Sequence, residues 1–67
     1  MRVTVNGEER AIAAASATVA DLVRAMGLEG RRIAVERNGA IVPKSRYAET
    51  RLEHGDRLEI VGAVGGG

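Results

Sequence analysis

The sequence predicts an α+β domain, in which a mixed sheet of four to five strands carries one main helix on one of its faces. Three observations favour this class. Two Asn-Gly pairs, at 6–7 and 38–39, each separate short runs rich in apolar residues, as tight β-hairpin turns do. Residues 18–26 have the spacing of an amphipathic helix. The 67 residues, 45% of them hydrophobic, suffice for one small domain with a single core.

The first hairpin is predicted from residues 1–13. Met1 to Val5 alternates apolar and polar side chains, which is typical of a half-buried strand. Asn6-Gly7 then provides two residues that tolerate a positive φ, as a two-residue hairpin turn requires. We expect the second strand to run from Glu8 to about Ala13, with Ile12 as its main core residue.

The predicted helix begins at Thr18. Thr18 and Asp21 have the spacing of a capping box, in which each side chain accepts a hydrogen bond from the other residue's backbone N–H. Gly27 stands where a left-handed residue commonly ends a helix. The residues at i, i+3, i+4 and i+7 are all apolar, so they form one face that belongs in the core. They are Val19, Leu22, Val23 and Met26.

A second hairpin follows the helix. The stretch 33–37 reads as a strand, Asn38-Gly39 as its turn, and 40–42 as a short return strand. Pro43 ends this strand because proline cannot donate a hydrogen bond to a ladder.

The last strand is predicted at 57–61, where Leu58 and Ile60 share one face and Val61 lies on the other. Before it, residues 44–51 show no long period, so we expect a short helical turn or an irregular crossover there. Residues 53–56 form a turn.

The order of these elements predicts a β-grasp arrangement. The helix must bury its apolar face on the sheet, because no other element is large enough to cover it. The first and last strands can then pair in parallel at the centre of the sheet, and the C-terminus projects from it. The predicted core consists of Val3, Val5, Ile12, Val19, Leu22, Val23, Met26, Val35, Leu58 and Ile60.

The composition argues against several classes of function. Ten basic and nine acidic residues give a net charge of +1 without a basic stripe, and Tyr47 is the only aromatic residue, so nucleic-acid binding is not expected. No stretch is long and apolar enough for a membrane span or a signal peptide, and we expect a cytoplasmic protein that is monomeric when free. Cysteine is absent and His54 is the only histidine, so we expect neither catalytic residues nor a metal site. The chain is predicted not to be an enzyme.

The most distinctive stretch is the glycine-rich end. We expect residues 1–64 to form the domain and 65–67 a flexible tail, because three glycines offer little packing against the entropy cost of ordering. Such a tail suits the presentation of the Gly67 carboxylate to a narrow cleft, where adenylation by ATP would make it an acyl electrophile. The bland alternative is a frayed end or a linker. The apolar residues expected to contact a partner at the root of this tail are Val61, Ala63 and Val64; their alternative is packing under a loop.

In order and spacing, these features resemble the ThiS family of ubiquitin-like sulfur carriers. The resemblance covers essentially the whole chain, although the third terminal glycine departs from the two that are common in the family. It rests on the first Asn-Gly hairpin, the capped helix 18–26, the stretches 34–43 and 55–61, and the glycine terminus.

The resemblance implies a mechanism. An adenylating (ThiF-like) enzyme would use ATP and Mg²⁺ to activate the Gly67 carboxylate, while Gly65 and Gly66 lie in the narrow passage to its active site. Sulfur from a persulfide-bearing donor protein would displace AMP and leave a thiocarboxylate. A thiazole synthase (ThiG-like) would then take this sulfur for the thiazole ring of thiamin. The chain itself would bind no cofactor.

Two alternatives remain at this stage. Sulfur carriers for molybdopterin, cysteine or tRNA thiolation share the fold and the terminus, and nothing in the residues separates them. A β-grasp interaction module with an inert tail would have the same core and turns without the carrier chemistry.

Overall fold

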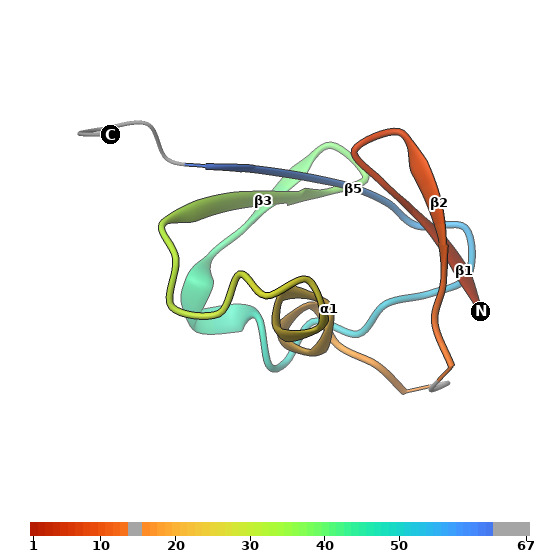
Figure 1. Cartoon of the computed structure of the whole chain (residues 1–67), viewed down its shortest axis with the longest axis horizontal. Coiled ribbons are helices and arrows are strands. Elements are labelled where there is room, and N and C mark those ends of the chain that lie inside the picture. Colours follow the sequence, from red (N-terminus) through yellow and green to blue (C-terminus); the bar gives the residue numbers. More distant parts are fainter. Residues whose placement is uncertain (14–15, 63–67) are drawn as a thin grey trace.

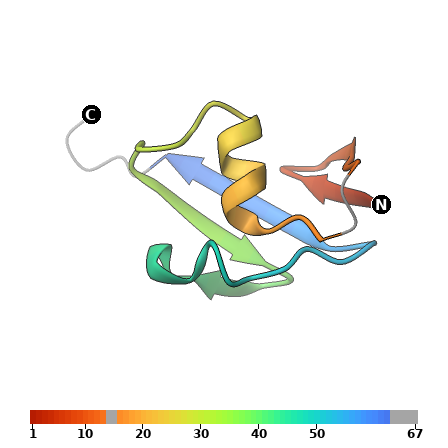
Figure 2. The same cartoon turned by 90° about the horizontal axis from the view of Figure 1, so that it is seen from below.

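The computed structural model describes residues 1–13 and 16–62 of the chain. It shows a five-stranded mixed sheet with helix α1 (Val19–Ala25) on one face, as the sequence predicts (Figures 1 and 2). The predicted site residues Ala63, Val64, Gly65, Gly66 and Gly67 lie outside the described residues.

Both Asn-Gly pairs form the predicted hairpin turns. The first joins β1 (Arg2–Val5) to β2 (Glu8–Ala11), and the second joins β3 (Ile33–Arg37) to β4 (Ala40–Val42). All four turn residues have positive φ: 52° and 84° at Asn6 and Gly7, and 53° and 87° at Asn38 and Gly39. Two successive left-handed residues define the type I′ turn, whose twist matches that of the paired strands.

The last strand, β5 (Arg57–Gly62), lies at the centre of the sheet, in the order β2-β1-β5-β3-β4. It runs parallel to β1, with Thr4 opposite Arg57, and antiparallel to β3, with Val35 opposite Ile60. The parallel central pair is the predicted one. Figure 1 shows β5 leading away from the end at which the N-terminus lies.

Helix α1 has defined caps at both ends. Thr18 Oγ1 accepts from the Asp21 N–H at 3.2 Å, and the Asp21 carboxylate accepts from the Thr18 N–H at 2.9 Å, which completes the capping box. At the other end Gly27 has φ 72°. Its N–H donates to the Arg24 carbonyl, and the Leu28 N–H donates to the Val23 carbonyl, which is the Schellman arrangement.

The connection between β4 and β5 packs against the start of the helix. It contains a short 3₁₀ helix at Lys44–Arg46. The Val19 N–H donates to the Thr50 carbonyl and the Ala20 N–H to the Tyr47 carbonyl, so two helix N–H groups without an intrahelical acceptor find partners in this connection. The hydrophobic periodicity of the sequence does not predict these hydrogen bonds between the helix and the connection.

The core lies between α1 and the sheet and contains eight of the ten predicted residues. Ile12 and Met26 are only partly buried against it. β2 was predicted to run to about Ala13, but it ends at Ala11. Beyond it in the described residues, only Ile12 still exchanges backbone hydrogen bonds with the first hairpin strand, through Met1. Buried residues that were not predicted are Ala17, Val42, Leu52 and Asp56.

Candidate functional site at the end of β5

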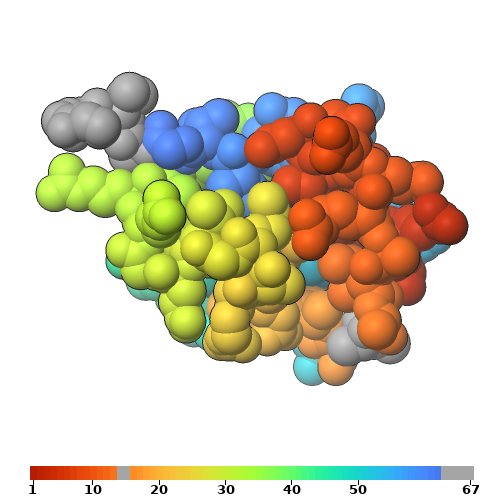
Figure 3. All heavy atoms as spheres, viewed as in Figure 1, coloured from red at the N-terminus to blue at the C-terminus, as the bar shows by residue number. Residues whose placement is uncertain are grey.

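The candidate site is the end of β5, from which the chain leads to the glycines. On one side β3 pairs with β5 as far as Ile33 opposite Gly62. On the other side β1 ends at Val5, and the next residue, the turn residue Asn6, makes the further hydrogen bonds to β5. In the space-filling view, the end of β5 (blue) lies beside the start of β3 (yellow-green), towards the end of the molecule's long axis opposite the N-terminus (Figure 3).

Asn6 extends the β1–β5 ladder with its side chain. Its backbone N–H donates to the Leu58 carbonyl at 2.9 Å. Its Oδ1 accepts from the Ile60 N–H at 2.7 Å, and its Nδ2 donates to the Ile60 carbonyl at 3.0 Å. Asn6 therefore holds β5 two residues before Gly62. The sequence predicts Asn6 only as a turn residue, since an Asn-Gly pair does not reveal what the side-chain amide contacts.

The start of β5 is held by a buried carboxylate, Asp56, which is 5% exposed. It accepts from Arg37 Nε at 2.7 Å, from Asn38 Nδ2 at 3.0 Å and from the Glu53 N–H at 2.8 Å. Burial alone would raise the pKa of Asp56, but these donors and the Arg37 charge outweigh it and hold the pKa below its ordinary value. This network fixes the β3–β4 turn to the start of β5.

The face of the sheet opposite α1 has no element over it among the described residues (Figure 1). Val61 lies on this face with 57% of its surface exposed, as the strand alternation predicts. Ile41, on β4, is 66% exposed and was not predicted as part of a site. Its exposure follows from the register, which places it opposite Glu36 on this same face.

The side chains considered for other chemistry have ordinary surroundings. His54 is exposed, and its Nδ1 accepts from the Arg2 N–H at 3.0 Å. No cluster of metal-ligating side chains occurs within residues 1–13 and 16–62, and no helix in that part of the chain is long and apolar enough to cross a membrane.

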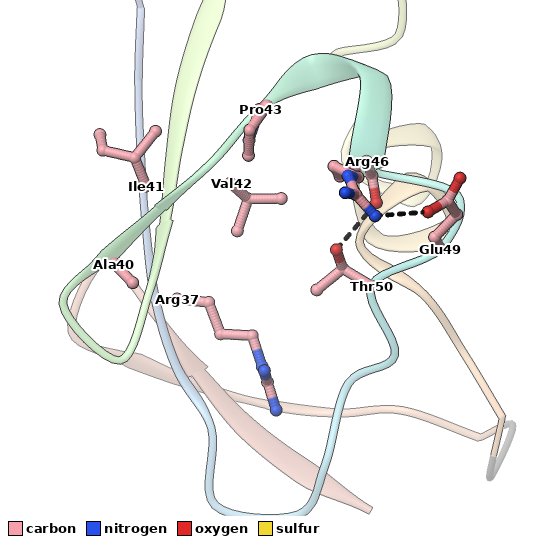
Figure 4. A pocket seen from close by; sticks show the side chains of 8 residues that line it. All are labelled: Arg37, Ala40, Ile41, Val42, Pro43, Arg46, Glu49 and Thr50. Carbon is pink, nitrogen blue, oxygen red and sulfur yellow. Dashed lines mark hydrogen bonds and ion pairs between the residues drawn. The ribbon is translucent and has the colours of Figure 1, made fainter.

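An open hollow of about 340 Å³ lies between β4 and the crossover (Figure 4). Two guanidinium groups line it, but each has a carboxylate partner. Arg37 is bound to Asp56, and Arg46 to Glu49 at 3.0 Å. The hollow therefore has no uncompensated guanidinium group for an anionic ligand.

A sequence model of the ThiS family matches residues 3–67. The chain belongs to the ThiS family. It is 40% identical to the sulfur carrier protein ThiS of Bacillus subtilis over 63 residues, which cover 94% of this chain and 96% of that protein.

A solved structure and a longer relative agree with this family. The crystal structure of the thiamine biosynthesis protein ThiS from Geobacter metallireducens superposes with a TM-score of 0.86 at 30% identity and covers both chains completely. The chain is also 51% identical, over all its 67 residues, to a thiazole synthase of Paramagnetospirillum magneticum. It spans only 20% of that synthase. The superposition on the ThiS structure from Geobacter metallireducens confirms the predicted β-grasp fold.

Proposed function

We propose that this ThiS-family chain carries sulfur for thiamin biosynthesis as a thiocarboxylate on Gly67. The observation that carries the proposal is the placement of β5. The strand is held by β3 as far as Gly62 and by Asn6 as far as Ile60, and Gly62 precedes Gly67 by five residues in the sequence. Five residues of extended chain span up to roughly 17 Å, enough to bring a carboxylate into a cleft that the domain itself cannot enter.

The activation step uses the carboxylate as a nucleophile. A Gly67 oxygen attacks the α-phosphorus of Mg-bound ATP in an adenylating enzyme, and pyrophosphate leaves. Glycines at 65–67 suit this step because no side chain has to pass the entrance of the active site. The enzyme supplies ATP and Mg²⁺, and this chain supplies the carboxylate and the surface by which it is recognised.

The sulfur step uses the acyl adenylate as an electrophile. A persulfide sulfur of a donor protein attacks the acyl carbon and AMP leaves, and a thiol then reduces the acyl disulfide to the thiocarboxylate. The chain has no cysteine, so both sulfur atoms of the persulfide come from outside.

The acceptor we propose is a thiazole synthase. The 51% and 36% identical relatives are both called thiazole synthase, and this chain matches 20% of each. A carrier-like segment and a synthase within one polypeptide support a functional partnership between the two. This observation favours the thiamin pathway over molybdopterin, cysteine or tRNA thiolation.

Val61 is proposed to contact the adenylating enzyme, together with Ala63 and Val64. Val61 combines an apolar side chain, 57% exposure and a position next to the root of the tail.

The experiment that tests the proposed function is ATP–pyrophosphate exchange with the adenylating enzyme of the source organism. It is followed by measurement of intact mass for the replacement of one oxygen by sulfur. A carrier that supports no exchange at any concentration would contradict the proposal.

A further inference from the structure

We propose that Asn6 is a positioning residue for the activation of the Gly67 carboxylate. Its side-chain amide fixes the part of β5 from which the chain continues to the glycines, and it thereby sets the rate of adenylation rather than the affinity for the adenylating enzyme. This inference rests on the proposed function, because the step that it concerns is the attack of the carboxylate on ATP. Asn6 touches neither ATP nor the reacting atoms; it acts through β5.

The Asn6 side chain continues the hydrogen-bond ladder between β1 and β5 after β1 has ended. Along β1, the Thr4 N–H donates to the Asp56 carbonyl and the Asn6 N–H donates to the Leu58 carbonyl, each at 2.9 Å. The next rung of the ladder, at Ile60, needs a residue beyond Asn6, but there the chain turns back into β2. The Asn6 carboxamide fills this rung, because it carries the same acceptor and donor as a peptide unit. Its Oδ1 accepts from the Ile60 N–H at 2.7 Å and its Nδ2 donates to the Ile60 carbonyl at 3.0 Å.

The position needs asparagine for two separate reasons. The φ of Asn6 is 52°, in the left-handed region that asparagine and glycine enter more readily than most residues. The rung at Ile60 needs both an acceptor and a donor, which the carboxamide supplies. Glycine at this position would keep the turn and leave the rung empty. Aspartate would keep the acceptor but place an oxygen that cannot donate against the Ile60 carbonyl.

The rung at Ile60 is the last point at which β5 is held on its β1 side within residues 1–13 and 16–62. Beyond it β3 alone pairs with β5 in this part of the chain, as far as Gly62. Without the amide, the strand is held from one side only after Leu58, and its end can twist about the pairing with β3. A displacement of about 1 Å at a reacting group can cost a hundredfold in rate. Looser positioning of the strand that carries the tail should therefore lower kcat. KM should change little, because the apolar side chains proposed to contact the enzyme are unaltered.

Asn38 provides the matched control, because it makes the corresponding contacts at the other end of β5. It also has a positive φ, 53°. Its N–H donates to the Arg57 carbonyl at 2.7 Å, and its Oδ1 accepts from the Arg57 N–H at 2.9 Å. Its Nδ2 donates to Asp56 at 3.0 Å. Arg57 is the first residue of β5, at the end away from the glycines. Asn38→Gly therefore removes side-chain hydrogen bonds from the same kind of turn and the same strand, but leaves the rung at Ile60 intact.

The test is ATP–pyrophosphate exchange with the adenylating enzyme, in which kcat and KM for the carrier are measured separately. The wild type, Asn6→Gly, Asn6→Asp and Asn38→Gly are compared at a temperature at which circular dichroism shows that all four are folded. Asn6→Gly should lower kcat about tenfold and leave KM within about twofold. Asn6→Asp, which loses the donor, should also lower kcat, so the result does not depend on one variant. Asn38→Gly should lower the melting temperature at least as much as Asn6→Gly and leave kcat within about twofold of the wild type.

Three results would overturn the inference while the wild type is activated. They are a kcat within about twofold of the wild type for both Asn6 variants, a loss that lies wholly in KM, and an equal fall of kcat in Asn38→Gly. The last of these would show that kcat follows the stability of β5 as a whole and not its position next to the tail. Failure of the wild type itself to be activated would instead overturn the proposed function.

Discussion

Replacing Asp56 with asparagine tests whether the buried carboxylate positions β5. The substitution keeps the shape of the side chain but removes its charge. It also places an amide NH₂ group, which is a donor, where a carboxylate oxygen now accepts two hydrogen bonds. Arg37, whose side chain is only 27% exposed, then loses its close ion-pair partner. Breaking a fully buried pair costs about 3–5 kcal/mol. Since Arg37 keeps some solvent contact, we expect Asp56→Asn to lower the free energy of unfolding by about 2–3 kcal/mol.

This loss is large for a chain of this length. A domain of 67 residues is stable by roughly 3–10 kcal/mol. At about 4–8 °C per kcal/mol, the loss should lower the melting temperature by about 8–24 °C. Urea denaturation at neutral pH measures the loss. Glu9→Gln is the matched control: the Arg2–Glu9 pair has a similar distance, 2.8 Å, but both side chains are more than 60% exposed. Its removal should cost less than about 1 kcal/mol.

We also expect the loss of stability caused by Asp56→Asn to depend on pH. The pKa of Asp56 is depressed in the folded state, so its stabilisation is present above the ordinary carboxyl pKa of about 4 and is lost as the pH falls through the folded pKa. The difference in unfolding free energy between wild type and Asp56→Asn should therefore shrink as the pH is lowered from about 7 to about 2. A loss below about 0.5 kcal/mol at neutral pH, or a loss independent of pH, would refute the assignment.

Three further predictions concern the core, the hydrogen bonds by which Asn6 holds β5, and the proposed docking residue Val61. Leu22→Ala should lower the free energy of unfolding by about 2–5 kcal/mol, because Leu22 is 2% exposed; a change below about half a kcal/mol in urea denaturation would mean that the helix face is misassigned. Asn6→Ala should speed hydrogen exchange of the Ile60 amide about tenfold relative to the Leu58 amide, which keeps its backbone partners. An Ile60 amide that exchanges equally fast in the wild type and in Asn6→Ala would show that the Asn6 side chain does not hold β5. Val61→Glu should raise the KM of activation while stability stays within about 0.5 kcal/mol; an unaltered KM would remove Val61 from the docking surface.

The elements with local rules were predictable from the sequence. The capping box of Thr18, the left-handed Gly27 and both Asn-Gly turns depend on residues within a few positions of one another. The order of hairpin, helix and hairpin then leaves few ways to bury one amphipathic helix on a sheet. This is why the central parallel pair of β1 and β5 could be inferred.

The features that were missed depend on contacts between distant segments. Leu52 and Ala17 lie in stretches without a period, and they are buried because the crossover pairs with the start of the helix through the Leu52 N–H and the Ala17 carbonyl. Asp56 follows a glycine in a polar turn, a context typical of a solvated residue. Only the register of β3 against β5 brings Arg37 and Asn38 to it.

The exposed half of the candidate site was partly predictable. Alternation along β5 placed Val61 on the open face, and the structure confirms this exposure. The position of Ile41 and the opposition of the Glu36 and Glu59 carboxylates were not predicted, because they depend on how β3, β4 and β5 pair. The roles of Gly65, Gly66 and Gly67 stay predictions.

The intact mass of the carrier after activation tests the central claim most directly. The full-length chain is incubated with ATP, Mg²⁺, the adenylating enzyme, a persulfide donor and a thiol. A variant that lacks Gly66 and Gly67 is treated in parallel. The deletion withdraws the carboxylate by up to roughly 7 Å, and a shift of about 1 Å can already cost a hundredfold in rate. We predict that one oxygen is replaced by sulfur in the full-length chain only. Equal sulfur incorporation in the truncated chain, or a native protein that continues beyond Gly67, would contradict the account.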